Sequence, residues 1–293
     1  MIYFNYRKGV FLMTINDVLA ALGVVLNGIP QALLAATYGF ASIPTAFGFI
    51  VGAVACLFYG SAIPISFQAE TIALAGMLGK DIRERLSIIL FSGITMVILG
   101  LTGTLSIIVN FAGSTIINAM MAGVGIMLTR ISLAGLKESR VVTASSIVSA
   151  FITYFFFGQN LVYTIVVCVV FSSLVANIFK INFGGGIIEN YKKIEIKKPI
   201  INLNVIRGAL ALACLTIGAN IAFGNITASM TGKYEANIDY LTIYSGLADA
   251  VSSLFGGGPV EAIISATAAA PNPLASGILM MAIVTVILFF GLL

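Results

Sequence analysis

The stretch "FGGGPVEAIISAT", Phe255 to Thr267, places three glycines, a proline and a carboxylate between two long apolar runs. Glycines let the backbone bend and pack closely, and a proline suits the first position of a helix. The pattern predicts a break in an apolar helix, with a new half-helix that begins at Pro259. Glu261 would then lie in the first turn, where the positive end of the helix dipole stabilises a negative charge.

The composition around this stretch is that of a polytopic membrane protein. The chain has 293 residues, of which 59% are hydrophobic and 9% are charged, whereas a soluble domain has about 25% charged residues. There is no histidine, and the three cysteines lie in apolar runs without metal-ligand spacing. We therefore expect neither a metal nor a cofactor. The net charge of +4 needs no nucleic-acid partner, because lysine and arginine between spans serve orientation in the bilayer.

Apolar segments of spanning length recur along the whole chain. A spanning helix needs about 20 apolar residues. The candidate spans are 16–36, 43–60, 86–109, 115–136, 141–157, 160–180, 206–229, 240–255 and 275–293. Two further segments, 61–78 and 256–271, are shorter, open with glycine or proline and carry a glutamate. Each of these predicts an extended stretch that leads into a half-helix, which gives eleven elements in all.

The chain divides into two halves that resemble each other weakly. The polar segment 179–204 reads as the linker between them. "QAETIALAG" (68–76) aligns with "PVEAIISAT" (259–267), with Glu70 on Glu261. Short segments broken by glycine or proline at matching places in two halves indicate a transporter's binding site.

Three carboxylates inside apolar segments are candidates for proton coupling: Glu261, Glu70 and Asp249. Ionisable residues within the membrane are functional hypotheses by default. Each also has a structural interpretation. Glu261 could serve as nothing more than a helix cap, Glu70 could face water at a helix end, and Asp249 could pair with a cation. Asp17 reads as a helix cap.

Polar and aromatic side chains supply further candidates for ligand contact. Asn220 either faces a cavity or makes an interhelical hydrogen bond. Phe67 and Phe223 either stack on a flat ligand or pack in the core.

Four runs resemble the nucleobase:cation symporter-2 family, the xanthine/uracil permeases. They are "NDVLAALGVVLNGIP", "PISFQAETIALAG", "NAMMAGVGIML" and "YSGLADAVSSLFGGGPVEAIISAT". The resemblance implies an all-α fold of two inverted seven-span repeats (7+7), with discontinuous half-helices at elements 3 and 10. About 11 of the 14 elements are present. It assigns residues 1–110 and 205–293 to a core domain, 111–180 to a gate domain and 181–204 to the linker.

The resemblance also implies roles for single residues. Glu261 would bind the base, Val260 would offer a backbone contact, and Phe67 and Gln68 would line the extended part of the third element. Asn220 stands where family members often carry a carboxylate. An amide cannot take a proton, so coupling would fall to Glu261, Glu70 or Asp249.

Two features depart from the family pattern. The chain ends at Leu293, inside the eleventh span, so we expect a truncated chain that lacks spans 12–14. Lysine and arginine cluster at 80–85, 137–140 and 180–207. The positive-inside rule then puts the N-terminus outside, whereas the family has a cytoplasmic N-terminus.

The sequence predicts a multi-pass plasma-membrane permease for a purine or pyrimidine nucleobase, coupled to protons, with elevator-like movement of core against gate. One alternative is an anion transporter of the sulfate-permease type, and another is a truncated, non-transporting fragment or partner subunit. An enzyme is not expected, because HExxH and GxSxG motifs are absent. The base, the coupling ion, its stoichiometry and a homodimeric state stay open.

Overall fold

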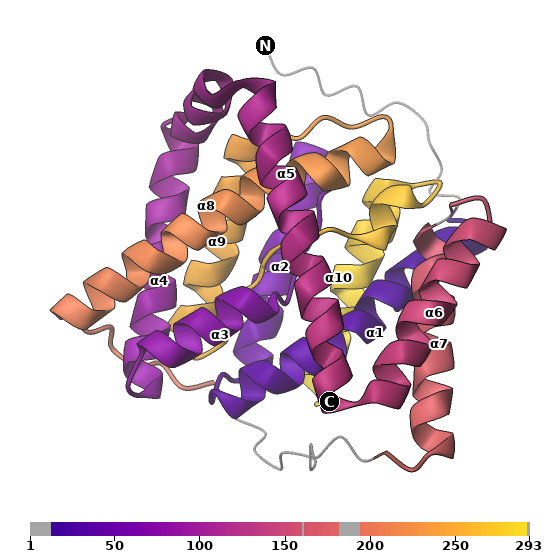
Figure 1. Ribbon diagram of the computed structural model, residues 1–293. Coiled ribbons are helices and arrows are strands. Elements are labelled where there is room, and N and C mark those ends of the chain that lie inside the picture. The colour runs from indigo at the N-terminus through magenta and orange to yellow at the C-terminus, as the bar shows by residue number, and fades with distance from the viewer. Residues whose placement is uncertain (1–12, 160, 182–193, 292–293) are drawn as a thin grey trace.

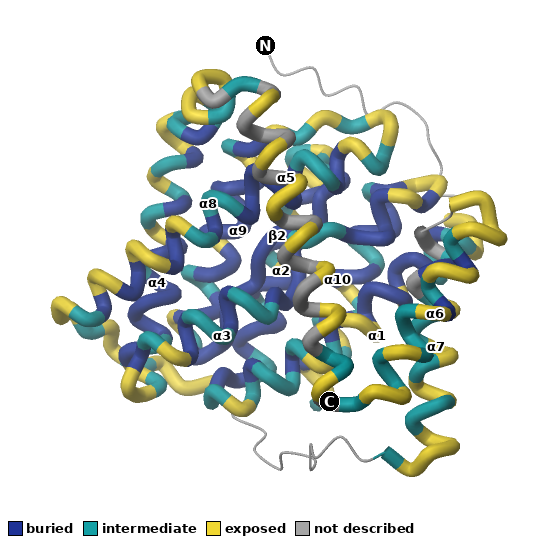
Figure 2. The backbone as a smooth tube through the Cα atoms, viewed as in Figure 1, coloured by how far each residue is buried: buried dark blue, intermediate teal, exposed yellow. Residues whose placement is uncertain are grey.

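The computed structural model describes residues 13–159, 161–181 and 194–291, and for parts of α5 and α7 it describes only the backbone. The first half contains α1 (Ile15–Thr37), α2 (Ser42–Tyr59), β1 (Ile65–Ser66), α3 (Ala69–Leu78), α4 (Ile82–Leu101), α5 (Thr104–Glu138), α6 (Arg140–Phe156) and α7 (Leu161–Ile178). The second half contains α8 (Leu203–Thr231), α9 (Ile238–Leu254), β2 (Glu261–Ala262), the 3-10 helix η1 (Ala266–Ala269) and α10 (Pro273–Phe290). Figure 1 shows the bundle of helices, and Figure 2 labels β2 near its centre.

The fold confirms the predicted class of helical, multi-span membrane protein. Among the described residues, α1, α2, α4, α8 and α10 are long and apolar enough to cross a membrane. Figure 2 shows buried residues at the centre of the bundle and exposed residues on its periphery. Large apolar side chains such as Phe58 and Phe156 are among the exposed ones, at 65% and 82%. An apolar exterior of this kind suits a lipid environment.

Local sequence signals set the helix ends. Thr14 and Asp17 form a capping box at the start of α1, which confirms the cap predicted for Asp17. Asp81 caps α4, and Asn202 and Asn237 cap α8 and α9.

One predicted span is wrong in its second half. The span expected over 86–109 ends at Leu101, because the chain turns at Gly103 with φ of 66°. Helix α5 follows and contains a non-helical break at Gly113 (φ 72°, ψ 170°). Gly103 lies between Thr102 and Thr104 inside a long, mostly apolar segment, so hydropathy averaged over the length of a span does not reveal the turn.

The two halves interleave in the core. Helix α4 packs against α9 and α8, and α2 packs against α9 and α10. The α4–α9 contact is close enough that a Cβ on Gly93 would lie 2.6 Å from the Gly246 carbonyl oxygen, and a Cβ on Gly246 would lie 2.6 Å from that of Gly93. Outside this core, α6 packs against α7 and α5, and α7 contacts α1. The division into a core domain and a gate domain remains a prediction.

The third element is the predicted half-helix: β1 is extended, and α3 follows it. The tenth element differs from the prediction. Glu261 does not lie in the first turn of a helix but in β2, which pairs antiparallel with β1, and only the four-residue η1 follows. Backbone polar groups at membrane depth need partners. Strand β1 supplies them, so the segment after Pro259 stays extended.

Candidate functional site

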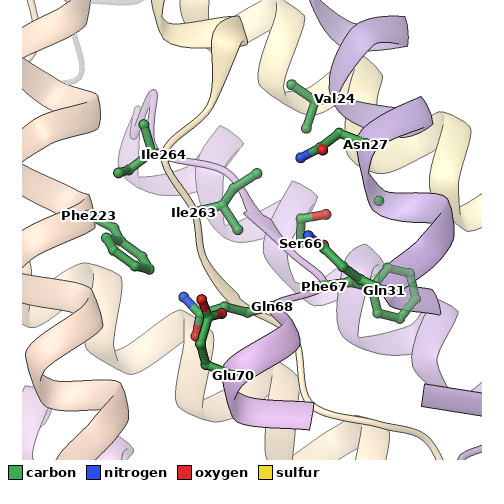
Figure 3. A pocket seen from close by; sticks show the side chains of 11 residues that line it. Val24, Asn27, Gln31, Ser66, Phe67, Gln68, Glu70, Phe223, Ile263 and Ile264 are labelled. Atoms are coloured by element: carbon green, nitrogen blue, oxygen red, sulfur yellow. The ribbon is translucent and has the colours of Figure 1, made fainter. Parts of the chain in front are cut away.

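A cavity of about 290 Å³ opens beside the crossing of β1 and β2. It is bounded by α1, by the junction of β1 and α3, by α8 and by the segment after β2. Its lining residues are Val24, Asn27, Gly28, Gln31, Ser66, Phe67, Gln68, Glu70, Phe223, Ile263 and Ile264. Figure 3 shows their side chains from both halves of the chain converging on one space.

The start of α3 forms the most polar part of this cavity. Gln68 is the N-cap residue with extended backbone (φ −132°, ψ 118°), and its side chain does not cap the helix. The first-turn N–H groups of a helix carry its positive dipole end. Glu70 lies in that first turn, and Figure 3 shows both Gln68 and Glu70 at the start of α3 beside the cavity.

The Gln68 side chain also joins the two halves of the site. Its Nε2 donates to the Ala262 carbonyl oxygen in β2 at 3.1 Å. Its Oε1 is buried and has no hydrogen-bond partner among the described residues. The hydrogen bond to Ala262 therefore ties the start of α3 to β2.

Two amides on α1 complete the polar lining. Asn27 and Gln31 are four residues apart and therefore lie on one face of the helix. Neither residue was predicted from the sequence to contact a ligand, although two amides at helical spacing in an apolar helix are a recognisable signal. No lysine or arginine is among the described residues that line the cavity.

The aromatic candidates both reach the cavity. Phe223 comes from α8, and Figure 3 shows its ring opposite the α1 side. Phe67 lines the cavity and also packs on Phe49, with ring centroids 5.1 Å apart. Of the residues that the sequence offered for ligand contact or proton coupling, the cavity therefore collects Phe67, Gln68, Glu70 and Phe223.

The other candidates lie behind the cavity wall. Glu261 is 0% exposed, and its Oε1 accepts a hydrogen bond from Thr216 Oγ1 at 2.7 Å. The N–H of Val260 donates to Asp249 Oδ1 at 2.8 Å, so it is not free for a ligand.

Asn220 is likewise 0% exposed. Its Nδ2 donates to Thr242 Oγ1 at 3.3 Å and to Ser245 Oγ at 3.1 Å. Of the two roles that the sequence offered for Asn220, the structure therefore shows the interhelical hydrogen bond, between α8 and α9.

The chain has the fold of a transporter's membrane domain. It matches the transmembrane domain of a cyanobacterium bicarbonate transporter, BicA, with a TM-score of 0.61. The match covers 97% of this chain and 84% of that chain at 16% sequence identity. At this identity the likeness establishes the fold, including its inverted repeats.

The sequence comparisons add no family. No protein family profile matches the chain, and no curated protein matches it. The resemblance to xanthine/uracil permeases is thus confirmed only for the transporter fold, and nothing in the comparisons supports a nucleobase in particular.

Proposed function

We propose that this chain is a secondary transporter that carries a small anion across the membrane. The observation that carries the proposal is the fold match to the membrane domain of a bicarbonate transporter over 97% of the chain. A cavity of about 290 Å³ lies at the junction of the two halves, where such folds place their substrates.

Helix α3 supplies the anion-binding chemistry in this proposal. Its uncapped N-terminus offers backbone N–H donors and a positive dipole end. The amides of Asn27 and Gln31 add neutral donors from α1. A neutral donor set releases an anion more readily than a lysine or arginine would, which suits a carrier.

Glu70 determines how an anion enters this cavity. Two negative charges at close range in a low-dielectric site repel strongly. We therefore propose that the anion binds together with a proton on Glu70, so that substrate and proton move together. Movement of the interleaved core against α5–α7 would carry the site across the membrane, and we place the protein in the plasma membrane.

A nucleobase is the second candidate substrate. Phe223 and Phe67 are the observation that favours it, because both rings line a cavity that also contains three amides. A flat, neutral ligand with several donors would use the Glu70 carboxylate as an acceptor and would need no proton on it.

Reconstituted vesicles test both substrates. We would measure uptake of radiolabelled bicarbonate, sulfate, nitrate, uracil and xanthine, with and without an inward proton gradient. Bicarbonate would be assayed at alkaline pH, so that dissolved CO₂ contributes little. The variant is Glu70→Gln, and its matched control is Glu235→Gln in the exposed loop between α8 and α9.

We expect saturable uptake of one anion that a proton gradient stimulates. Glu70→Gln should keep uptake but lose the stimulation, because an amide cannot release a proton, and Glu235→Gln should behave as wild type. Uptake of a base alone would replace the anion with the second candidate. Uptake of none of these solutes would contradict transport by this chain on its own.

A further inference from the structure

Two carboxyl groups lie against each other behind the cavity wall. Asp249 of α9 is 1% exposed and Glu261 of β2 is 0% exposed, and their side chains are in hydrogen-bonding contact. Each has one oxygen satisfied by a donor: Thr216 Oγ1 donates to Glu261 Oε1, and the Val260 N–H donates to Asp249 Oδ1. Glu261 Oε2 is buried and receives no hydrogen bond from a fixed donor among the described residues.

No cation balances this pair within the part of the chain that the structure describes. Helix α2 carries no lysine or arginine. The arginines of α4 lie in its first turn, where Arg83 donates to the Lys198 carbonyl and Arg85 to the Tyr38 carbonyl. Arg207 of α8 is exposed and nine residues from Thr216, a helical distance of roughly 13 Å.

The other titratable groups on the surrounding elements are engaged elsewhere. Cys56 of α2 and Tyr244 of α9 both donate to the Ile63 carbonyl. Asp239, at the start of α9, accepts from the Ser106 N–H. Glu70, at the start of α3, lines the cavity.

We propose that Asp249 and Glu261 share a single proton at neutral pH and form an internal proton-binding site separate from the cavity. Two adjacent ionised carboxylates without a cation repel strongly in a low-dielectric interior. One proton removes that repulsion and converts the contact into a hydrogen bond, because a protonated carboxyl can donate to Glu261 Oε2. The remaining charge is stabilised by the Thr216 hydroxyl and the Val260 N–H.

The site is connected to the cavity through the strand pair. Glu261 lies directly opposite Ser66, and Ser66 lines the cavity. Two and three residues further along the chain, Ile263 and Ile264 line it as well. Loading or releasing the proton therefore changes the hydrogen bonds of a strand that forms the cavity wall. The assignment of this proton to transport coupling rests on the proposed function, whereas its presence in the protein does not.

Infrared spectroscopy of the purified full-length protein in lipid nanodiscs tests the proton directly. A protonated carboxyl has a C=O stretching band that shifts in D₂O and is distinct from carboxylate bands. We would compare wild type, Asp249→Asn, Glu261→Gln and the control Glu70→Gln at neutral pH. In Asp249→Asn and in Glu261→Gln, the new amide group can donate a hydrogen bond to the remaining carboxylate, which then stays ionised. We therefore expect both variants to fold without the shared proton.

We expect the band in wild type and in Glu70→Gln, and its loss in Asp249→Asn and in Glu261→Gln. Absence of the band from wild type overturns the proposal, whatever the variants do, and so does a band that persists unchanged in both variants of the pair. Stabilisation of wild type by sodium without the band would overturn it in favour of a metal-ion site. A band in a protein that transports nothing would leave this proton in place and would count only against the proposed function.

Discussion

Ser66 and Glu261 lie directly opposite each other in the antiparallel pair β1–β2, and they are 195 residues apart. Pro64 and Pro259 have the same separation, and so do the last residues of α2 and α9, Tyr59 and Leu254. A single offset therefore relates the ends of α2 and α9, the two prolines and the two strands, whereas the starts of α4 and α10, Ile82 and Pro273, are 191 residues apart. Under this offset Ser66 and Glu261 are equivalent positions of the two halves, and they face each other in the strand pair. In the strand pair the counterpart of Glu261 is therefore Ser66, four residues before the Glu70 of the predicted alignment.

This register is open to a cross-linking test. Ile65 and Ala262 are also direct partners, and opposed residues in an antiparallel pair have Cα atoms about 4.5–5.5 Å apart, within disulfide range. In a background without the three native cysteines, Ile65→Cys with Ala262→Cys should form a disulfide under mild oxidant. Mass spectrometry of the digested protein measures it.

The control for the cross-link shifts one partner by a single residue. In Ile65→Cys with Ile263→Cys, the second side chain points to the opposite face of the strand. It should cross-link far more slowly. Equal rates in the two proteins would show that β1 and β2 do not hold the observed register.

The sequence was a good guide wherever a signal was local. Apolar runs predicted the spans, Asp17 predicted the start of α1, and the proline-broken segment predicted the half-helix α3. The turn at Gly103 escaped prediction because the two threonines beside it, Thr102 and Thr104, interrupt the long apolar segment too briefly to lower its average hydropathy.

The site was predicted less well, because its geometry depends on a tertiary partner. "GGGPVE" looks like a helix start when it is read alone, but the β1 backbone draws it into a strand. The same pairing turns Glu261 towards Thr216 and Asp249, behind the cavity wall. The cavity is lined by four of the residues that the sequence offered as candidates, Phe67, Gln68, Glu70 and Phe223.

The α4–α9 contact predicts that two glycine-to-alanine changes have different effects. Gly93→Ala places a Cβ 2.6 Å from the Gly246 carbonyl oxygen and 3.0 Å from the Ala250 nitrogen, both backbone atoms that cannot turn aside. The added methyl group would push the two helices apart and should lower the free energy of unfolding by about 1–3 kcal/mol. A Cβ on Gly218 in α8 would meet no other atom within 4 Å, so Gly218→Ala should be neutral or stabilise the helix by up to about 1 kcal/mol.

Thermal unfolding of the purified protein in detergent, followed by a thiol-reactive dye or by size-exclusion chromatography, measures both changes. We expect a lower midpoint for Gly93→Ala and an unchanged or higher midpoint for Gly218→Ala. A Gly93→Ala protein as stable as wild type would mean that α4 and α9 are not in close contact.

A buried carboxylate fastens the first helix to the last described one. Asp17 is 0% exposed and accepts from the N–H and Nδ2 of Asn272 at 2.7 and 3.1 Å, and from the N–H and hydroxyl of Thr14 at 2.7 and 2.8 Å. Asp17→Ala leaves these donors without an acceptor and should destabilise the fold by about 2 kcal/mol or more. Asp17→Asn keeps one acceptor oxygen and should therefore lower the free energy of unfolding by less than Asp17→Ala does. The exposed Glu235→Ala serves as control in the same unfolding assay.

A second contact of the same kind joins α4 of the first half to α8 of the second half. Here the acid is on α4, where Glu84 accepts from Asn202 Nδ2 at 2.9 Å and from Asn204 Nδ2 at 3.0 Å, both at the start of α8. Glu84→Ala should therefore also lower the unfolding midpoint. If neither Asp17→Ala nor Glu84→Ala does so, the helix starts are not joined as described.

Phe223 separates the two substrate candidates. Stacking of a base on an aromatic ring is worth about 1–3 kcal/mol, so Phe223→Ala should weaken the binding of a nucleobase by about tenfold or more. A small anion has no face to stack and binds through N–H donors, so its apparent affinity should change by less than about twofold. Phe156→Ala is the matched control, because this side chain of α6 is 82% exposed and lies outside the cavity. Competition against the transported solute gives both affinities. A tenfold loss for an anion would mean that Phe223 shapes the anion site itself, and the role of the α3 N-terminus as its main contact would then be wrong.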